Sequence, residues 1–215
     1  MSFSLHHLVR EPKVKLDKNP LLLLLHGYGS NEEDLFSFAQ ELPDNYYIVA
    51  ARAPYDLMYG SYAWYAINFD ADENKFSDIP QAQESKDVVI RFIDELVAHY
   101  PIDAQEVTLI GFSQGSILSY AVALSYPEKI KGVVAMSGYW NPEIAVPNFA
   151  QKDASKLHFF VSHGTSDQVI PVEWARKSVP ALEQFGITIE YKEYPVGHGV
   201  SPQNFFDFRN WLQKH

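Results

Sequence analysis

The chain has 215 residues, 47% of them hydrophobic and 14% aromatic. This is enough for one large hydrophobic core but not for two domains that each have a large core. Its formal net charge of −10 argues against nucleic acid or an anionic membrane as a main partner. The absence of cysteine excludes disulfides, thiolate metal sites and cysteine nucleophiles, and it fits a cytoplasmic location. Residues 1–16 lack the features of a secretory signal, and no apolar run approaches a membrane span. We therefore expect one domain over residues 1–215, without integral membrane association.

Short apolar runs predict strands that are mostly buried on both faces, as in a parallel sheet. In chain order these runs are residues 21–25, 46–50, 107–110, 132–136, 158–162 and 187–194. Apolar residues at helical spacing predict the helices between them. These helices are residues 81–100, 114–126, 171–185 and a last one that is capped by Ser201 and continues through Leu212. Strand and helix in repeated order indicate an α/β fold with a mostly parallel central sheet and helices on both faces.

Two further features stand between the predicted elements. The acidic cluster at residues 31–34 reads as a capped first helical turn with Asn31 as the cap, rather than as a metal site, because no histidine lies close in sequence. The long connections 51–79 and 137–157 are too small for a separate cap domain. Since ligands of open α/β sheets bind beyond the carboxyl ends of strands, these connections are candidate pocket walls.

The sequence GFSQG, residues 111–115, follows the predicted strand 107–110 directly and opens the predicted helix 114–126. A glycine-flanked serine between a strand and a helix is typical of a nucleophile held on a tight turn. Gly111 and Gly115 would remove the Cβ atoms that collide where strand and helix cross closely. Ser113 is therefore the candidate nucleophile, and the alternative is a turn without chemistry.

A serine hydroxyl needs a base, and the base needs an orienting carboxylate. Beyond the strand 158–162 lies HGTSDQVIP with Asp167, and beyond the strand 187–194 lies PVGHGVSP with His198. The order Ser113, Asp167, His198 and the position of each at a strand's carboxyl end match a catalytic triad. Alternatively, Asp167 forms a turn after Ser166, and His198 is an ordinary loop residue.

The oxyanion of such a reaction needs backbone donors. The N–H of Gln114, at a helix N-terminus, is one, and the N–H of Tyr28 is the second, because Gly27 and Gly29 let the loop HGYGS bend inwards. Alternatively, HGYGS is only a tight turn before a helix. The remaining histidines are expected to be structural or solvated, and His26 and His163 in particular to bond loop backbone.

LHGYGSNEEDL, GFSQGSILS, HGTSDQVIP and GHGVSP stand in one order along nearly the whole chain. Together they resemble the phospholipase/carboxylesterase family of small α/β-hydrolases, which includes the acyl-protein thioesterases. The resemblance implies an α/β-hydrolase fold without a cap domain, and it implies the triad and the two oxyanion donors named above. Ser116 departs from the family pattern, which often has glycine there, and its hydroxyl could back-bond to a helix carbonyl. Tyr28 stands where many members carry an aliphatic residue, so it could narrow the acyl pocket.

Aromatic residues of the two long connections could line an apolar substrate groove, or equally could anchor those loops. They are Tyr59, Tyr62, Trp64, Tyr65, Tyr139 and Trp140. Exposed aromatic residues such as Trp140 could also serve a homodimer.

The leading interpretation is a serine hydrolase that cleaves carboxylic esters, or thioesters, through an acyl-enzyme. Its substrate would be a small-molecule or lipid-like ester, and no metal or organic cofactor is implied. Alternatives are a lysophospholipase, an acyl-protein thioesterase, a peptidase, or a ligand-binding relative without catalysis. A dienelactone-hydrolase-like role is disfavoured because those enzymes use a cysteine.

Overall fold

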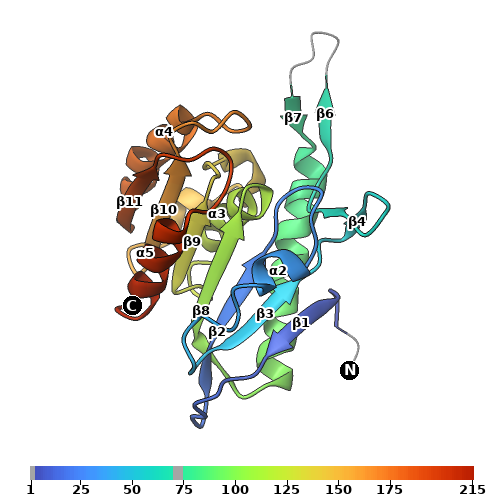
Figure 1. The fold of residues 1–215 in the computed structure, drawn as a ribbon, viewed down its shortest axis with the longest axis vertical. Helices are drawn as coiled ribbons and strands as arrows, with labels where there is room; N and C mark the ends of the chain where they lie inside the picture. Colours follow the sequence, from blue (N-terminus) through green and yellow to red (C-terminus); the bar gives the residue numbers. More distant parts are fainter. Residues whose placement is uncertain (1–2, 70–74) are drawn as a thin grey trace.

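The computed structural model describes residues 3–69 and 75–215, and its centre is a seven-stranded sheet (Figure 1). The strand order is β1-β3-β2-β8-β9-β10-β11. The bounds are β1 His7–Arg10, β2 Asn19–Leu25, β3 Tyr47–Ala51, β8 Ile102–Phe112, β9 Gly132–Met136, β10 His158–Gly164 and β11 Thr188–Tyr194. Every neighbouring pair is parallel except β1 with β3, which is antiparallel. The predicted mostly parallel sheet is confirmed.

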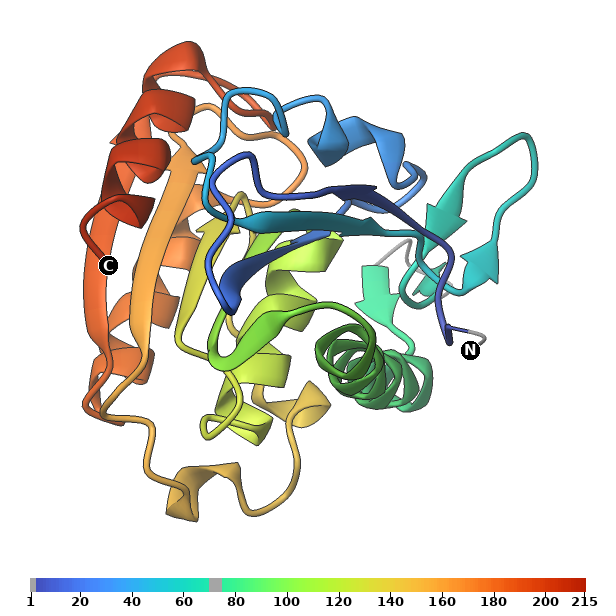
Figure 2. The same cartoon turned by 90° about the horizontal axis from the view of Figure 1, so that it is seen from below.

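Helices cover both faces of this sheet (Figure 2). They are α1 Glu33–Phe36, α2 Ile79–His99, α3 Gln114–Ser125, α4 Val172–Glu183 and α5 Pro202–Leu212. Alternate leucines of β2 serve the two faces: Leu23 packs in the cluster with α2, α3 and α4, and Leu24 packs in the cluster with α1 and α5. The unbroken leucine run therefore reflects a strand with apolar layers on both sides.

Helix starts follow the local sequence. The Asp78 side chain accepts a hydrogen bond from the backbone N–H of Gln81 at 3.0 Å, and Pro80 occupies the first turn of α2. The predicted cap Ser201 accepts from the N–H of Asn204 at 3.1 Å, with Pro202 as the first residue of α5. These caps hold both helices at the expected positions.

The first helix differs from the prediction. Its cap position is Glu32 rather than Asn31, although Asn31 Oδ1 still accepts from the N–H of Glu33 at 2.9 Å. Glu32 is buried, and its carboxylate accepts from Arg52 Nε at 2.7 Å. The hydrogen bond from Arg52 lowers the pKa of Glu32 against the effect of burial. Glu32 therefore anchors the start of α1 to Arg52, the residue after the end of β3.

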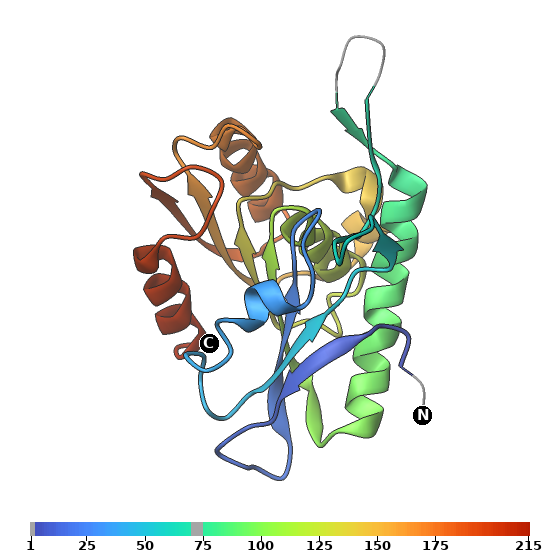
Figure 3. The same cartoon turned by 45° about the vertical axis from the view of Figure 1, so that its right-hand side comes forward.

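The connection 51–79 contains small hairpins that the sequence did not predict. Its strands are β4 Tyr55–Asp56, β5 Tyr62–Ala63, β6 Ile67–Phe69 and β7 Lys75–Ser77. β4 pairs with β5, and β6 pairs with β7 above the start of α2 (Figure 3). The connection 137–157 contains only the short 3₁₀ turns Pro142–Ile144 and Phe149–Gln151. The described residues include no separate cap domain, as expected, and none of their helices is both long and apolar enough to cross a membrane.

Candidate active site

Ser113 lies at the junction between β8, which ends at Phe112, and α3, which begins at Gln114. Its backbone has φ +53° and ψ −116°, a conformation that non-glycine residues rarely adopt. Its N–H donates to Met136 O at 2.9 Å, and its carbonyl accepts from Ile117 N at 3.1 Å. These bonds hold the strained turn, which presents the side chain beyond the carboxyl edge of the sheet.

Two glycines make this turn sterically feasible. A Cβ on Gly111 would lie 2.5 Å from Gly115 O, and a Cβ on Gly115 would lie 2.0 Å from Leu25 O. Both contacts are with backbone, which cannot rotate away as a side chain does. The crossing of α3 over β2 and β8 therefore requires glycine at both positions.

The structure brings the side chains of Ser113, Asp167 and His198 into one hydrogen-bonded row. His198 Nε2 lies 2.9 Å from Ser113 Oγ, and His198 Nδ1 lies 2.7 Å from Asp167 Oδ2. The other carboxylate oxygen, Oδ1, accepts from the N–H of Val169 at 2.8 Å and of Ile170 at 2.9 Å. Residues from the loops after β8, β10 and β11 thus meet at one edge of the sheet, which the prediction of a parallel sheet requires.

The hydrogen bonds around Asp167 determine the protonation of the row. Burial alone would raise the pKa of Asp167, but hydrogen bonds from His198 and from the N–H of Ile170 and Val169 outweigh it and lower the pKa below 3.8. The carboxylate is therefore ionised at neutral pH, and His198 Nδ1–H donates to it. The lone pair of neutral His198 then lies on Nε2 and faces the Ser113 hydroxyl.

The two backbone groups expected to bind an oxyanion have no protein partner in the part of the chain that the structure describes. Neither the N–H of Tyr28 nor that of Gln114 donates to a protein acceptor there. Gly27 lies directly against the nucleophile, since a Cβ on it would be 3.4 Å from Ser113 Cβ. Tyr28 is 44% exposed, so its side chain lies at the surface rather than in the core.

Ser116 does not make the back-bond that the sequence suggested. Its Oγ is buried without a hydrogen-bond partner among the described residues, whereas Ser119 Oγ donates to Gly115 O at 2.7 Å. A Cβ on Gly138 would lie 2.5 Å from Ser116 Oγ, so the hydroxymethyl group occupies space that Gly138 leaves open. The departure from glycine at position 116 is accommodated by glycine on the facing loop.

His26 and His163 both contact loop backbone, as predicted, and His163 also lies close to Asp167. His26 Nδ1 lies 2.8 Å from Gly27 O, and its Nε2 accepts from Ala53 N at 3.1 Å. His163 Nε2 donates to Ile170 O at 2.8 Å. The same nitrogen lies 3.3 Å from Asp167 Oδ2, a proximity that sequence spacing did not indicate.

The aromatic residues proposed for a groove separate into different environments. Trp64 and Tyr65 are 0% and 1% exposed, so they do not line an open groove and instead fit the alternative interpretation, that these aromatic residues anchor their connection. Helix α2 and the start of α3 contact them, because Ser85 Oγ donates to Trp64 O and Gln114 Nε2 donates to Tyr65 O. Tyr59 is fully exposed at a hairpin tip, and half-buried Tyr62 lies under the guanidinium of Arg52.

Tyr139 and Trp140 do line a hollow, of about 260 Å³, beside α4. Its other lining residues are Trp174, Lys177, Ser178 and Ala181. Tyr139 contacts Trp174 edge to face at 4.8 Å, a partner that sequence reasoning missed because Trp174 lies in a predicted helix. Next to Tyr139, a Cβ on Gly138 would be 3.2 Å from the backbone carbonyl oxygen of Ser113, so the loop that carries Tyr139 packs against the turn at Ser113.

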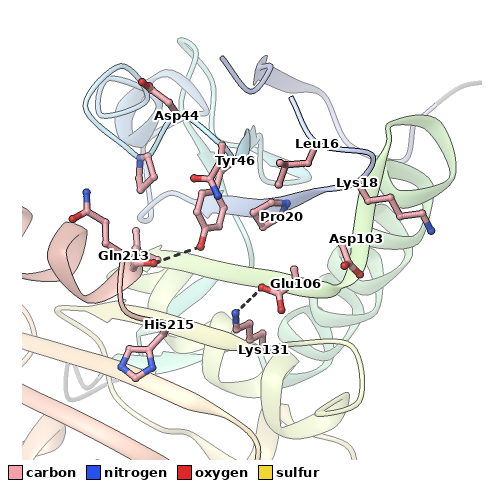
Figure 4. Close-up of a pocket in the computed structure, with 13 residues that line it drawn as sticks. Leu16, Lys18, Pro20, Asp44, Tyr46, Asp103, Glu106, Lys131, Gln213 and His215 are labelled. Carbon is pink, nitrogen blue, oxygen red and sulfur yellow. Dashed lines mark hydrogen bonds and ion pairs between the residues drawn. The ribbon is translucent and has the colours of Figure 1, made fainter. Parts of the chain in front are cut away.

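A larger cavity of about 600 Å³ lies at the opposite edge of the sheet (Figure 4). It is lined by residues at the amino ends of β2, β3, β8 and β9 and by the last residues of the chain, including Tyr46, Glu106, Lys131 and His215. None of the proposed site residues lies there. Within the described residues, no cluster of three or more histidine, aspartate or glutamate side chains could hold a metal ion.

The model of the phospholipase/carboxylesterase family matches residues 6–215, so the chain belongs to that family. A probable SOBER1-like carboxylesterase of Arabidopsis thaliana is 34% identical over 114 residues, which cover 53% of this chain and 44% of that protein. The chain thus spans about half the length of that protein, and likewise 46% of a probable carboxylesterase of Oryza sativa subsp. japonica. An acyl-protein thioesterase 1 of Cryptococcus neoformans is 27% identical over 100% of this chain and 99% of that protein.

Solved structures agree on the fold. The crystal structure of esterase PE8 has a TM-score of 0.83 at 26% identity and covers 100% of this chain and 99% of its own. The carboxylesterase of Bacillus cereus has a TM-score of 0.84 at 20% identity, over 98% of this chain and 94% of its own, and supports the fold alone. The fold is that of the α/β-hydrolases.

Proposed function

We propose that this protein is a serine hydrolase that cleaves carboxylic esters through an acyl-enzyme, with Ser113, His198 and Asp167 as its catalytic residues. The observation that carries the proposal is the hydrogen-bonded row from Ser113 Oγ through His198 to ionised Asp167. Family membership and a full-length esterase-like fold support it.

In the first half of the reaction, His198 Nε2 takes the proton of Ser113 as Oγ attacks the ester carbonyl carbon. Asp167 stabilises the resulting imidazolium and keeps its proton on Nδ1. The backbone N–H groups of Tyr28 and Gln114 bind the oxyanion of the tetrahedral intermediate. When the carbon–oxygen bond to the leaving group breaks, His198 returns its proton to the departing alcohol.

In the second half, water attacks the acyl-enzyme while His198 accepts one of its protons. Collapse of this second intermediate releases the carboxylic acid and restores the Ser113 hydroxyl with the proton held by His198. These steps require no metal or organic cofactor. A thiol could leave in place of an alcohol, and the thioesterase named among the relatives makes thioesters a second substrate class to test.

The test is hydrolysis of p-nitrophenyl esters from acetate to palmitate by the wild type and Ser113→Ala. Removing the nucleophile is expected to lower kcat by about 10⁶-fold, as in other serine hydrolases. An optimum at short acyl chains would identify a carboxylesterase with a small pocket. A long-chain optimum would favour lysophospholipids or acyl-thioesters. If Ser113→Ala kept most of its activity, or the wild type had none, the proposal would fail and ligand binding would replace it. The cytoplasmic location and the homodimer stay predictions.

A further inference from the structure

Trp64, one of the aromatic residues considered for a groove wall or a loop anchor, is fully buried and contacts both segments proposed to supply oxyanion donors. Its indole Nε1–H donates to the carbonyl of His26 at 2.9 Å, two residues before Tyr28. Its backbone N–H donates to Gln114 Oε1 at 2.8 Å. One residue therefore makes a buried hydrogen bond to each half of the proposed oxyanion site.

The Gln114 side chain is held at both ends of its amide. Oε1 accepts from the N–H of Trp64, and Nε2 donates to Tyr65 O at 2.8 Å. Such a pair of opposed hydrogen bonds fixes the rotation as well as the position of the amide. Gln114 is only 3% exposed, so a lost partner would leave a buried polar group unpaired. Because the donor N–H belongs to the same residue, this clamp restrains the first turn of α3.

On the other side, the orientation of the Tyr28 N–H follows from the peptide group it shares with Gly27. A backbone N–H can only donate, so His26 Nε2, which accepts from Ala53 N, carries no proton. The ring proton is then on Nδ1, which donates to Gly27 O at 2.8 Å. Burial lowers the pKa of His26, although the bond to Gly27 opposes this, and the ring stays neutral. Since the peptide is planar, holding Gly27 O also aims the N–H of Tyr28.

The residues around Trp64 are themselves anchored to the rest of the fold. The N–H of Gly29 donates to Tyr62 O at 2.9 Å, and the N–H of Tyr62 donates to Ser30 O at 2.8 Å. Ser85 Oγ, on α2, donates to Trp64 O. Strand β5 and the residues after it are therefore hydrogen-bonded to three segments: the loop after β2, the start of α3 and helix α2.

We propose that Trp64 is a positioning residue that sets the separation of the Tyr28 and Gln114 N–H groups across the oxyanion. This role rests on the proposed serine hydrolase function. Trp64 is buried, so it does not contact substrate and acts through the two donor segments. Its removal should affect the transition state, where the oxyanion exists, more than the binding of the ester.

The test compares kcat for an oxoester and for the thionoester with the same acyl and leaving groups, in the wild type and in Trp64→Phe. The thiono sulfur is larger and a weaker hydrogen-bond acceptor, so its reaction gains less from two aligned N–H donors. Trp64→Phe is expected to lower oxoester kcat by about 10- to 100-fold with little change in KM, because one oxyanion donor is worth about 10²- to 10³-fold. The oxoester-to-thionoester rate ratio should fall by a similar factor.

Trp211→Phe is the matched control, because Trp211 is also a core indole, 4% exposed, but packs beside Phe160 in the other core cluster. It should keep the wild-type rate ratio. Thermal unfolding of each variant reports whether it folds. Gln114→Met is a second variant that keeps side-chain length, removes the clamp and should also lower the ratio.

The outcomes separate the two proposals. If folded Trp64→Phe and Gln114→Met both kept the wild-type ratio, the positioning role would be overturned while the hydrolase function stood. If the wild type cleaved neither ester, the proposed function would fail, and the role of Trp64 with it. A lower ratio in both variants, with Trp211→Phe unchanged, supports the role, because a general loss of packing would slow both esters alike.

Discussion

The two edges of the central sheet differ in cavity volume and in the side chains they bring together. The edge with the larger cavity is not the edge that holds the candidate catalytic residues. At the amino edge, the lining of the larger cavity, of about 600 Å³, includes charges that pair with each other, Lys131 with Glu106 at 2.6 Å (Figure 4). At the carboxyl edge the hollow is only about 260 Å³. The same edge holds His198, whose Nε2 lies 2.9 Å from Ser113 Oγ and whose Nδ1 lies 2.7 Å from Asp167 Oδ2. Convergent groups, rather than volume, distinguish the candidate site.

Backbone strain follows the same division. Of the described non-glycine residues with positive φ, Met58 and Tyr59 lie in the turn between β4 and β5, whereas Ser113 and Ser137 follow the carboxyl ends of strands of the central sheet. Ser113 and Ser137 both have φ +53° and follow the neighbouring strands β8 and β9. Such conformations cost roughly 1–3 kcal/mol each and persist only where surrounding structure enforces them. Among the described residues, no non-glycine residue at the amino edge has a positive φ, so this kind of backbone strain is not found there.

After the removal of the Ser113 hydroxyl itself, the largest expected effect at the carboxyl edge comes from Asp167→Asn. The two backbone N–H groups of Val169 and Ile170 require an oxygen at the Oδ1 position, so the new amide nitrogen must face His198 Nδ1. His198 would then carry its proton on Nε2 and could not accept the proton of Ser113. We expect kcat for ester hydrolysis to fall by about 10⁴-fold with the fold intact.

Asp153→Asn is the control for that substitution, because Asp153 is an exposed carboxylate that bonds only Ser155 among the described residues. Its activity should equal the wild type. Substantial hydrolysis by Asp167→Asn would mean that the row does not operate through the tautomer of His198.

Gly115→Ala tests the steric basis of the turn. The added methyl would lie 2.0 Å from Leu25 O, so α3 or β2 must move. We expect the free energy of unfolding, measured with urea, to fall by about 3 kcal/mol or more. Gly197→Ala is the matched control at the same edge, since its Cβ would have no neighbour closer than 3.9 Å, and its stability should be nearly unchanged. Equal stability of Gly115→Ala and Gly197→Ala would contradict the account of the crossing.

Much of this edge could be predicted because parallel strands bring their carboxyl ends together. Once the strands before Ser113, Asp167 and His198 were recognised, their meeting followed from topology, and the structure has their side chains in contact. Their catalytic roles remain proposals. The same logic could not foresee the contact of His163 with Asp167, because that depends on the side-chain directions of a residue in β10 and of a residue in the loop after it.

The burial of aromatic residues in the connection 51–79 could not be predicted, for a different reason. Trp64 and Tyr65 are buried and contact α2 and the start of α3, which are distant in sequence, so local pattern does not distinguish a core aromatic from a groove aromatic. Strand β1 was missed because its residues 7–10 are mostly half-buried at an edge and lack a continuous apolar run. Both errors concern contacts that only the assembled fold determines.

Acidification is expected to destabilise the protein through His26, near the carboxyl edge, and His158, near the amino edge. Burial lowers the pKa of both, opposed at His26 by the Gly27 hydrogen bond and reinforced at His158 by His215 and Lys131. The unfolded chain then binds more protons than the folded one below the usual histidine pKa of 6.5. The free energy of unfolding therefore falls as pH drops through that value.

Thermal unfolding between about pH 8 and pH 5 measures this effect. Lower pH also relieves the repulsion expected from a net charge of −10, so the wild type is compared with His158→Gln under identical conditions. The wild type should lose more stability on acidification than His158→Gln does. Identical pH slopes would show that the buried ring of His158 contributes nothing.

The smallest effect is expected at the amino edge, from Glu106→Gln. The pair of Glu106 with Lys131 is partly solvent-exposed, and such pairs contribute about 0–1 kcal/mol to folding. The free energy of unfolding should change by no more than that, and the hydrolysis of p-nitrophenyl esters should keep its wild-type kcat and KM. A tenfold loss of kcat in a folded Glu106→Gln protein would mean that the large cavity takes part in turnover. The contrast between the two edges would then reflect two coupled sites rather than one reactive edge and one inert one.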